Sequence, residues 1–188
     1  SLGVTEPHGL LLHGAPGVGK STFAMDFLKA TGRNTYICRK DKTNGDFVEQ
    51  IVEVFNKAAE TTPSIILLDD LDKFANGDRR RRDTDEFVAV QTCIDRVKDL
   101  QVFVVATAND IAKLPESLTR AGRFDNILEL SSPKGQDAQD IIAHYLARKP
   151  FVADMDIKRI ARLLDGRSCA ELETLVNEAG SYAAFDGR

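Results

Sequence analysis

The sequence predicts an α/β protein with a five-stranded parallel sheet flanked by helices, followed by a small all-helical domain. Short apolar runs of strand length alternate with amphipathic stretches through the first two thirds of the 188 residues. After Ser131–Gly135, which contains Pro133 and Gly135, only helical periodicity continues. We therefore expect an α/β domain over residues 1–132 and a helical lid domain over residues 133–188.

Five apolar runs are expected to form the strands. The helical stretches between them favour parallel pairing, because parallel strands need a long crossover connection. The predicted strands are Gly9–His13, Thr35–Cys38, Ser64–Leu68, Gln101–Ala106 and Asn126–Leu130. Ligands of such sheets bind at the carboxyl ends of the strands, so polar residues that follow a strand are the first candidates for a site.

The helical stretches carry apolar residues at spacings of three and four. Phe47, Ile51 and Phe55 form one such stripe. Ser168, followed three residues later by Glu171, predicts a capping box at the start of the last helix. The predicted helices cover about Lys20–Ala30, Asp46–Ala59, Asp85–Lys98, Gln136–Ala147, Asp156–Leu164 and Ala170–Ala184.

Composition excludes several classes of protein. The net charge is −4, from 25 basic and 29 acidic residues, so no global basic field attracts nucleic acid. No apolar run approaches the roughly 18 residues of a membrane span. Cys38, Cys93 and Cys169 are odd in number and far apart, which argues against a disulfide framework or a cysteine zinc site and predicts a reducing, cytoplasmic compartment. The three histidines form no zinc-hydrolase pattern.

A phosphate-binding motif lies between the first predicted strand and the first predicted helix. Gly14-Ala-Pro-Gly-Val-Gly-Lys20-Ser21 matches G-x-x-x-x-G-K-[S/T] in full. Backbone N–H groups of such a loop surround phosphate oxygens, the lysine reaches the β- and γ-phosphates, and the serine ligates Mg²⁺. The alternative is a glycine-rich turn that binds nothing. The predicted nucleotide-binding residues are Gly14, Ala15, Pro16, Gly17, Val18, Gly19, Lys20, Ser21 and Thr22.

Polar residues follow two further strands. Asp69 and Asp70 come directly after a buried run, which suits Asp69 to hold Mg²⁺ and Asp70 to polarise an attacking water as a general base. The alternative is a solvated acidic turn, which is a reasonable interpretation of Asp72 but a poor one of Asp69, because Asp69 directly follows a buried run. Asn109 follows the fourth strand and is suited to bind the γ-phosphate or its water, although such a residue alone is more often part of a loop.

Taken together, the motifs resemble the AAA+ ATPases, and among them the FtsH-type ATP-dependent metalloproteases. The resemblance covers nearly the whole chain, and the last of five ordered motifs favours the FtsH-type branch. The motifs are Walker A at Gly14–Ser21, Walker B at Leu67–Asp72, sensor 1 at Val105–Asn109, the second region of homology at Leu118–Asp125, and a sensor 2 segment at Gly166–Ala179.

This resemblance implies an ATPase that requires ATP and Mg²⁺ and acts on a protein substrate. It also implies a homo-oligomeric ring, usually a hexamer, with nucleotide bound between neighbouring copies. Arg120 and Arg123 match the arginine fingers, which would act in trans on the next copy's γ-phosphate. Without the surrounding Gly-Arg-Phe-Asp sequence, two surface arginines near a glycine turn would be the default interpretation.

Two positions depart from the family pattern. Asp70 stands where the family has glutamate, so its carboxylate lies further from the water; we expect weak hydrolysis that rises in Asp70→Glu. The family's pore triplet falls on Thr43-Asn44-Gly45, which lacks the aromatic residue. Either Lys42 and Phe47 contact a threaded polypeptide, or the ring does not thread chains in the usual way.

The chain is expected to be an ATPase module of a longer protein, because neither a peptidase domain nor a metal-binding histidine pair follows the last helix. A membrane anchor elsewhere in that parent protein is compatible with this sequence, although the chain itself predicts no membrane contact. Arg79–Arg82 is more simply a solvated loop than a nucleic-acid contact.

Three functions follow in order of support. The first is an ATPase module that remodels, unfolds or translocates a protein substrate. The second is a nucleotide-dependent assembly or scaffold protein with weak hydrolysis, indicated by Asp70. The third is a DNA-loading ATPase, which only the arginine run favours.

Overall fold

The computed structural model describes residues 8–40, 46–74, 84–120, 122–149 and 155–185. The chain forms two compact units. The sheet unit comprises Ser1–Gly14 and Lys20–Glu129, and the helical unit comprises Ala15–Gly19 and Leu130–Arg188. Five residues of the phosphate motif therefore pack with the helical unit, although the strand and helix beside them belong to the sheet unit.

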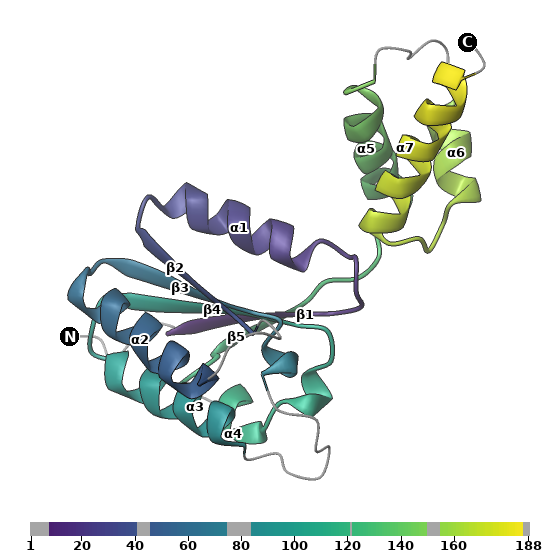
Figure 1. The fold of residues 1–188 in the computed structure, drawn as a ribbon. Helices are drawn as coiled ribbons and strands as arrows, with labels where there is room; N and C mark the ends of the chain where they lie inside the picture. The colour runs from purple at the N-terminus through teal and green to yellow at the C-terminus, as the bar shows by residue number, and fades with distance from the viewer. Residues whose placement is uncertain (1–7, 41–45, 75–83, 121, 150–154, 186–188) are drawn as a thin grey trace, which may run out of the picture. The chain divides into compact units, whose positions relative to one another are not determined.

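The sheet unit contains a five-stranded parallel sheet with the strand order β2-β3-β4-β1-β5 (Figure 1). All four strand pairings are parallel, and β3 is buried along its whole length. This confirms the predicted fold class, with element bounds that differ from the predicted ones by at most two residues. The strands are β1 Gly9–His13, β2 Asn34–Arg39, β3 Ser64–Asp69, β4 Val102–Ala108 and β5 Asn126–Glu129.

Helices cover both faces of this sheet. Helix α1 lies on one face, and α2 and α3 lie on the other (Figure 1). The sequence did not predict α4 or the two 3-10 helices η1 and η2, because segments of three or four residues are too short to show a period. The bounds are α1 Lys20–Thr31, α2 Phe47–Glu60, η1 Leu71–Lys73, α3 Asp85–Val97, η2 Ile111–Lys113 and α4 Glu116–Thr119.

Strand β3 illustrates how the core forms. Ile66 and Leu68 pack with α2 and α3 residues such as Phe55 in one buried cluster. Their neighbours Ile65 and Leu67, whose side chains point to the opposite face, are equally buried. A strand that is buried on both faces reads as a continuous apolar run, which is how the sequence reveals β3.

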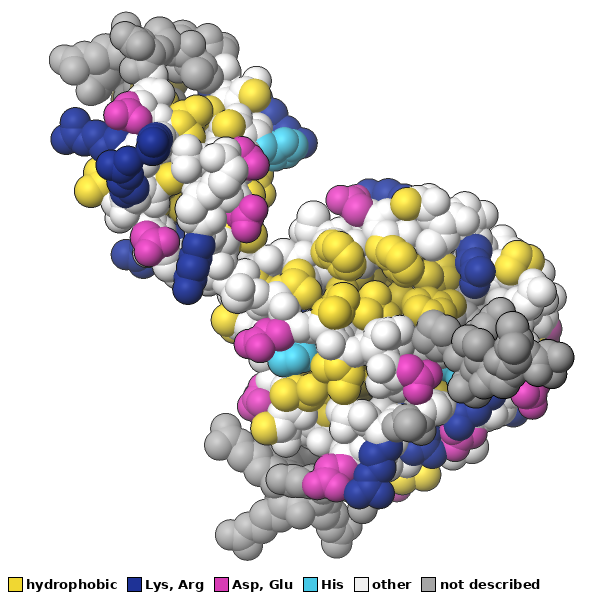
Figure 2. Space-filling view, turned by 180° about the vertical axis from the view of Figure 1, so that it is seen from behind, with side chains coloured by type: hydrophobic (Ala, Val, Ile, Leu, Met, Phe, Trp, Pro, Cys, Tyr) yellow, Lys and Arg dark blue, Asp and Glu magenta, His cyan; other side chains and the backbone are white. Residues whose placement is uncertain are grey.

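The edge of the sheet is covered less well than its centre. All four residues of β5 are exposed, and Figure 2 shows hydrophobic side chains gathered on the surface of this unit. The sheet unit therefore presents apolar area to solvent in addition to enclosing a core. Its exposed large hydrophobic residues are Phe23, Ile37, Val88, Leu100, Ile127 and Leu128.

The helical unit contains α5 Gly135–Leu146, α6 Ile157–Leu163 and α7 Cys169–Phe185. The predicted capping box is confirmed: the Ser168 N–H donates to the Glu171 carboxylate at 2.8 Å, and the Glu171 N–H donates to Ser168 Oγ at 3.3 Å. The apolar side chains of the three helices form a core of their own. Its buried members are Ala138, Ile142, Leu146, Ala161, Leu172 and Val176.

Phe47 contradicts one prediction. Its side chain is 5% exposed, and its ring meets that of Phe74 edge to face at 4.8 Å. A side chain held in the core cannot grip a threaded polypeptide, so that proposed role of Phe47 is wrong. Lys42, Thr43–Gly45 and Arg79–Arg82 lie outside the described residues. Among the helices that the structure describes, none is long and apolar enough to cross a membrane.

Candidate active site

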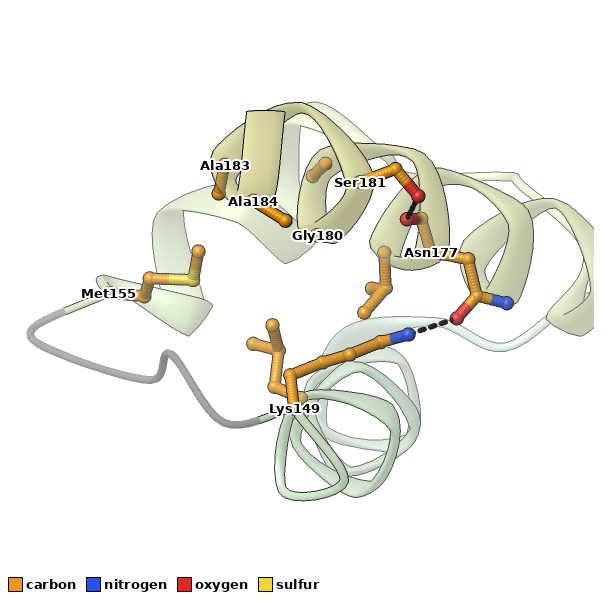
Figure 3. Close-up of a pocket in the computed structure, with 10 residues that line it drawn as sticks. Lys149, Met155, Asn177, Gly180, Ser181, Ala183 and Ala184 are labelled. Atoms are coloured by element: carbon orange, nitrogen blue, oxygen red, sulfur yellow. Dashed lines mark hydrogen bonds between the residues drawn. The ribbon is translucent and has the colours of Figure 1, made fainter. Parts of the chain in front are cut away.

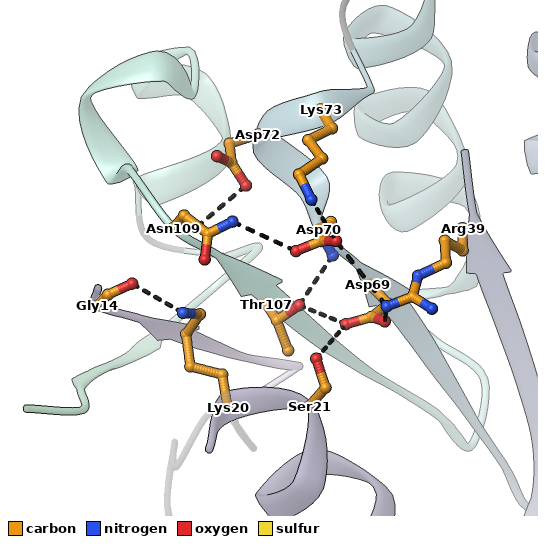
Figure 4. A network of polar contacts seen from close by, with 10 residues as sticks. All are labelled: Gly14, Lys20, Ser21, Arg39, Asp69, Asp70, Asp72, Lys73, Thr107 and Asn109. Atoms are coloured by element: carbon orange, nitrogen blue, oxygen red, sulfur yellow. Dashed lines mark hydrogen bonds and ion pairs between the residues drawn. The ribbon is translucent and has the colours of Figure 1, made fainter. Parts of the chain in front are cut away.

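Three segments that are distant in sequence meet at the carboxyl end of the sheet (Figure 4). Asp69 ends β3, Thr107 lies near the end of β4, and Ser21 lies in the first turn of α1. Asp69 Oδ1 accepts hydrogen bonds from Ser21 Oγ at 2.9 Å and from Thr107 Oγ1 at 2.7 Å. Because parallel strands end on the same edge, the sequence motifs around Ser21 and Asp69 form one site.

A cation neutralises the other oxygen of Asp69. Arg39 ends β2, and the strand register places it directly opposite Asp69. Its Nη2 lies 2.6 Å from Asp69 Oδ2 and 3.9 Å from Asp70 Oδ2. Since the Asp69 side chain is only 8% exposed, this ion pair and the two hydroxyl bonds together compensate for the cost of burying a carboxylate.

Asp70 lies next to this group with a left-handed backbone, at a φ of 58°. Its N–H donates to Thr107 Oγ1 at 2.8 Å. Lys73 Nζ binds its Oδ2 at 2.8 Å, and Asn109 Nδ2 donates to its Oδ1 at 3.4 Å. Contacts on both oxygens therefore hold the Asp70 carboxylate. Asp70 and Asn109, which the sequence analysis assigned to the attacking water, lie side by side.

Asp72 differs from its prediction. It is 9% exposed, and its Oδ1 accepts the backbone N–H of Asn109 at 3.0 Å. The interpretation of Asp72 as part of a solvated turn is wrong, because η1 turns the side chain inward toward the loop after β4. Asp72 thus fixes the backbone of Asn109, whose side chain contacts Asp70.

Lys20 is buried at the start of α1 and donates to the Gly14 carbonyl at 2.8 Å. Burial lowers the pKa of its amine, and the carboxylates of Asp70, Asp72 and Asp69 oppose that shift. The lysine therefore lies in the field of the acidic group. This position suits a charge that balances a polyanion brought to the same edge.

The glycines of the phosphate loop adopt backbone angles that favour glycine, with φ of +81° at Gly17 and +98° at Gly19. The loop contacts the start of α7 within the helical unit. The Ala170 N–H donates to the Gly17 carbonyl at 3.0 Å, and the Cys169 thiol donates to the Val18 carbonyl at 3.4 Å. These bonds explain why the loop packs with the helical unit.

The two candidate arginine fingers have different surroundings. Arg120 is 74% exposed and pairs with Glu116 at 2.9 Å. Arg123 is 21% exposed, and its Nε and Nη2 bind the Asp95 carboxylate at 3.2 and 2.7 Å. That contact lowers the pKa of Asp95. In the described part of the chain, neither arginine forms a hydrogen bond or ion pair with Asp69, Asp70 or Asn109.

These residues fit a magnesium–nucleotide complex. Mg²⁺ prefers oxygen ligands and retains several waters, and a serine hydroxyl bonded to a buried carboxylate provides such ligands. Ser21 and Asp69 are the side chains that would hold the ion. Gly17 and Gly19 give the loop the backbone form that phosphate-binding loops use.

Sequence reasoning missed Arg39, Lys73 and Thr107. Thr107 carried a weak signal, because residues two apart in a strand share a face, and Asn109 was already a candidate. Lys73 lies three residues after Asp70, which is one turn of a helix. Arg39 carried no signal, since its contact depends on the register between β2 and β3.

A separate pocket lies in the helical unit (Figure 3). Among its described lining residues, which are mostly apolar or small, Lys149 carries the only formal charge. Its amine donates to Asn177 at 2.6 Å. Among the described lining residues there is no acid, and the one hydroxyl, that of Ser181, donates to the Asn177 carbonyl at 3.0 Å.

Comparisons with known proteins agree with the motifs. The profile of the family described as "ATPase family associated with various cellular activities (AAA)" matches residues 10–132. The chain is 32% identical to a proteasome-activating nucleotidase of Archaeoglobus fulgidus, which matches 100% of this chain over 50% of its own length. It is 30% identical to a cell division cycle protein 48 homolog of the same organism, with 97% of this chain and 26% of that protein covered.

A third relative is the ATPase family gene 2 protein of Schizosaccharomyces pombe, which is 32% identical over 98% of this chain and 24% of its own length. The chain thus spans from 24% to 50% of the length of these relatives. The family profile covers well over half of the chain, including the loop at Gly14–Ser21 and the acids after β3. The protein belongs to the AAA family of ATPases.

Proposed function

We propose that this chain is an ATPase module that binds Mg²⁺–ATP and transfers its γ-phosphoryl group to water, driving the remodelling, unfolding or translocation of a protein substrate. The observation that carries the proposal is the hydrogen bond between Ser21 and Asp69, residues 48 apart in sequence. The names of the relatives, which include proteasome-activating nucleotidases, support a protein substrate.

Each residue of the site has a proposed role. Residues Gly14–Gly19, together with Thr22, contact the phosphates through the loop and first helical turn, and Lys20 balances the charge of the β- and γ-phosphates. Bound magnesium supplies positive charge to the phosphoryl oxygens. Ser21 and Asp69 hold that ion, while Asp70 orients and deprotonates the attacking water and Asn109 positions it.

The module is proposed to act in a ring of identical copies, a hexamer by analogy with its family. Arg120 is the better candidate for a finger in trans, because its guanidinium is exposed. Arg123 could act in trans only after leaving Asp95. The exposed apolar side chains of the sheet unit, such as Ile37 and Leu128, support contact with another copy.

We propose domain limits of 1–132 and 133–188, and a cytoplasmic location. The FtsH-type assignment rests on the segment Gly166–Ala179, whereas the relatives above are of other kinds. An attached protease would therefore be a property of a longer parent protein of that type.

A second candidate function is nucleotide-dependent assembly with little hydrolysis. The environment of Asp70 favours it, because Lys73 and Asn109 already occupy the two oxygens of the short carboxylate. Assembly driven by ATP without turnover would support this scaffold function. Turnover that rises with assembly would support the ATPase.

The test measures nucleotide binding and steady-state ATP turnover across protein concentration. We expect wild-type specific activity to rise with concentration, because a finger supplied in trans requires assembly. Lys20→Ala should weaken nucleotide binding by about 100-fold or more, since it removes a charge that contacts two phosphates. The matched control, Lys57→Ala, removes an exposed lysine whose partner is Glu53.

Equal nucleotide affinity of Lys20→Ala, Lys57→Ala and the wild type would disprove phosphate binding at this motif. Turnover that is flat across protein concentration would argue against a finger in trans while leaving nucleotide binding intact. The first outcome therefore tests nucleotide binding at this motif, and the second tests whether a neighbouring copy contributes to turnover.

A further inference from the structure

The two oxygens of Asp69 have partners of different kinds. Ser21 and Thr107 donate neutral hydroxyl bonds to Oδ1. Arg39 places a permanent positive charge 2.6 Å from Oδ2. The acid best placed to hold the metal is thus already neutralised by a cation of the same chain.

The backbone of Arg39 is held in the sheet, whereas its side chain is half-exposed. It pairs with Asp69 in the strand register, which fixes the position of its Cα. Its side chain is 53% exposed and lies within 3.9 Å of a second carboxylate, that of Asp70. Asp70 is the nearest second carboxylate for this guanidinium, and Lys73 Nζ already binds the same Oδ2 at 2.8 Å.

We propose that Arg39 competes with Mg²⁺ for Asp69 and thereby sets the magnesium concentration at which this module binds nucleotide. The inference rests on the proposed function, since it assumes that Asp69 holds the ion. Two cations that need the same carboxylate repel each other, and solvent screens this repulsion less around Asp69, whose side chain is 8% exposed, than at an open surface. Arg39 must therefore leave Asp69 Oδ2 when the metal binds.

This competition is distinct from an ordinary surface ion pair. Exposed ion pairs contribute little to stability. Here the removal of the arginine frees an acid that a ligand needs. Losing the charge should therefore tighten metal binding, which is the opposite of the effect expected from damage to a binding site.

The experiment titrates Mg²⁺ against a fluorescent ADP analogue and, separately, follows Mn²⁺ binding to the ADP complex by electron paramagnetic resonance. Arg39→Gln keeps a hydrogen-bond donor and loses the charge, so the half-saturating concentration of either metal should fall by roughly 5- to 50-fold. Arg39→Lys keeps the charge and should behave like the wild type. Arg33→Gln, an exposed arginine that precedes the other end of β2, is the matched control and should change nothing.

A metal dependence of Arg39→Gln that equals that of the wild type would overturn the competition. A higher metal requirement would overturn it too, because Arg39 would then support the site. ADP binding in EDTA should change less than the metal dependence does; an equal change would mean that Arg39 acts on the nucleotide. If the wild type binds no nucleotide at any Mg²⁺ concentration, the proposed function fails first, and this inference fails with it.

Discussion

The carboxyl edge of the sheet and the surface of the helical unit hold their polar side chains in opposite ways. At the sheet edge, Asp69 and Thr107 are buried and bonded to each other. In the helical unit, the Arg167–Glu171 pair at 3.0 Å is half-exposed on both sides. Both regions satisfy their polar groups, and they differ in whether water could replace a lost partner.

This difference distinguishes the candidate site from an ordinary surface. A buried polar group without a partner is costly, whereas an exposed group exchanges its partner for water. A connected buried network therefore persists only where every member is satisfied. The Ser21–Asp69–Thr107 group meets that condition, and the contacts of the helical unit do not require it.

The largest expected effect is a loss of ATP turnover at an exposed residue, which would show that a functional side chain need not belong to the buried network. Arg120→Ala should reduce ATP turnover by about 100-fold or more, because an arginine acting in trans stabilises charge in the transition state. Its unfolding midpoint should stay unchanged, since the side chain is 74% exposed. A steady-state assay measures the ATP turnover, and thermal unfolding measures the midpoint. Arg148→Ala, which removes an exposed arginine of the helical unit, is the control, and equal turnover of both variants would exclude Arg120 as the finger.

Thr107→Val should give the largest loss of stability. The variant removes the hydroxyl that donates to Asp69 and accepts from Asp70, so two buried polar groups lose a partner. We expect the free energy of unfolding to fall by about 3 kcal/mol, measured by urea denaturation. Thr35→Val, on the exposed side of β2, should stay within about 0.5 kcal/mol of the wild type. Similar losses in both variants would mean that the buried network adds no stability.

Asp70→Glu tests whether the tight network limits the chemistry. The longer side chain brings its carboxylate closer to the attacking water, and we expect turnover to rise by about 10-fold. Nucleotide affinity should be unchanged, because Asp70 is not proposed to bind the phosphates. Slower turnover in Asp70→Glu would show that the short carboxylate, with Lys73 and Asn109 on its oxygens, is already well placed.

Ser168→Ala tests an exposed polar contact of the helical unit. The capping box of α7 loses its hydroxyl, and we expect the helical unit to lose about 1 kcal/mol of stability. Ser181→Ala, which removes a hydroxyl near the C-terminal end of the same helix, is the control and should have a smaller effect. Circular dichroism during urea denaturation measures both. A loss as large as that of Thr107→Val would remove the distinction between the two regions.

The smallest effect concerns pH. The pKa of Asp95 is lowered from its ordinary value of 3.8, mainly by the hydrogen bond from Arg123. A depressed folded pKa means that the stability is present above pH 4 and is lost as the pH falls through the folded value. We expect the ion pair to contribute less than about 1 kcal/mol to the free energy of unfolding, because the Asp95 carboxylate is 42% exposed. In Asp95→Asn, the free energy of unfolding should fall less steeply with pH below pH 4. An unchanged slope would argue against a contribution from the Asp95–Arg123 ion pair.

Much of the site was predictable because its residues belong to local motifs. Ser21 and Asp69 were each identified from a few neighbouring residues, and parallel strand topology then required them to meet. Thr107 and Arg39 were not identified, because their roles depend on side chains reaching across strands. Asp72 and Phe47 were misassigned, since the sequence pattern gave no information about which way η1 and the start of α2 turn.

The sequence by itself determined the parallel sheet, the order of its helices and the phosphate loop, because strand length, helical period and glycine spacing are encoded in neighbouring residues. Only the tertiary structure decided how the charges are matched. The register of β2 against β3 brings Arg39 to Asp69, and the left-handed turn at Asp70 directs that carboxylate to Lys73 and Asn109. These contacts depend on distances of a few ångströms between segments, which no local pattern specifies.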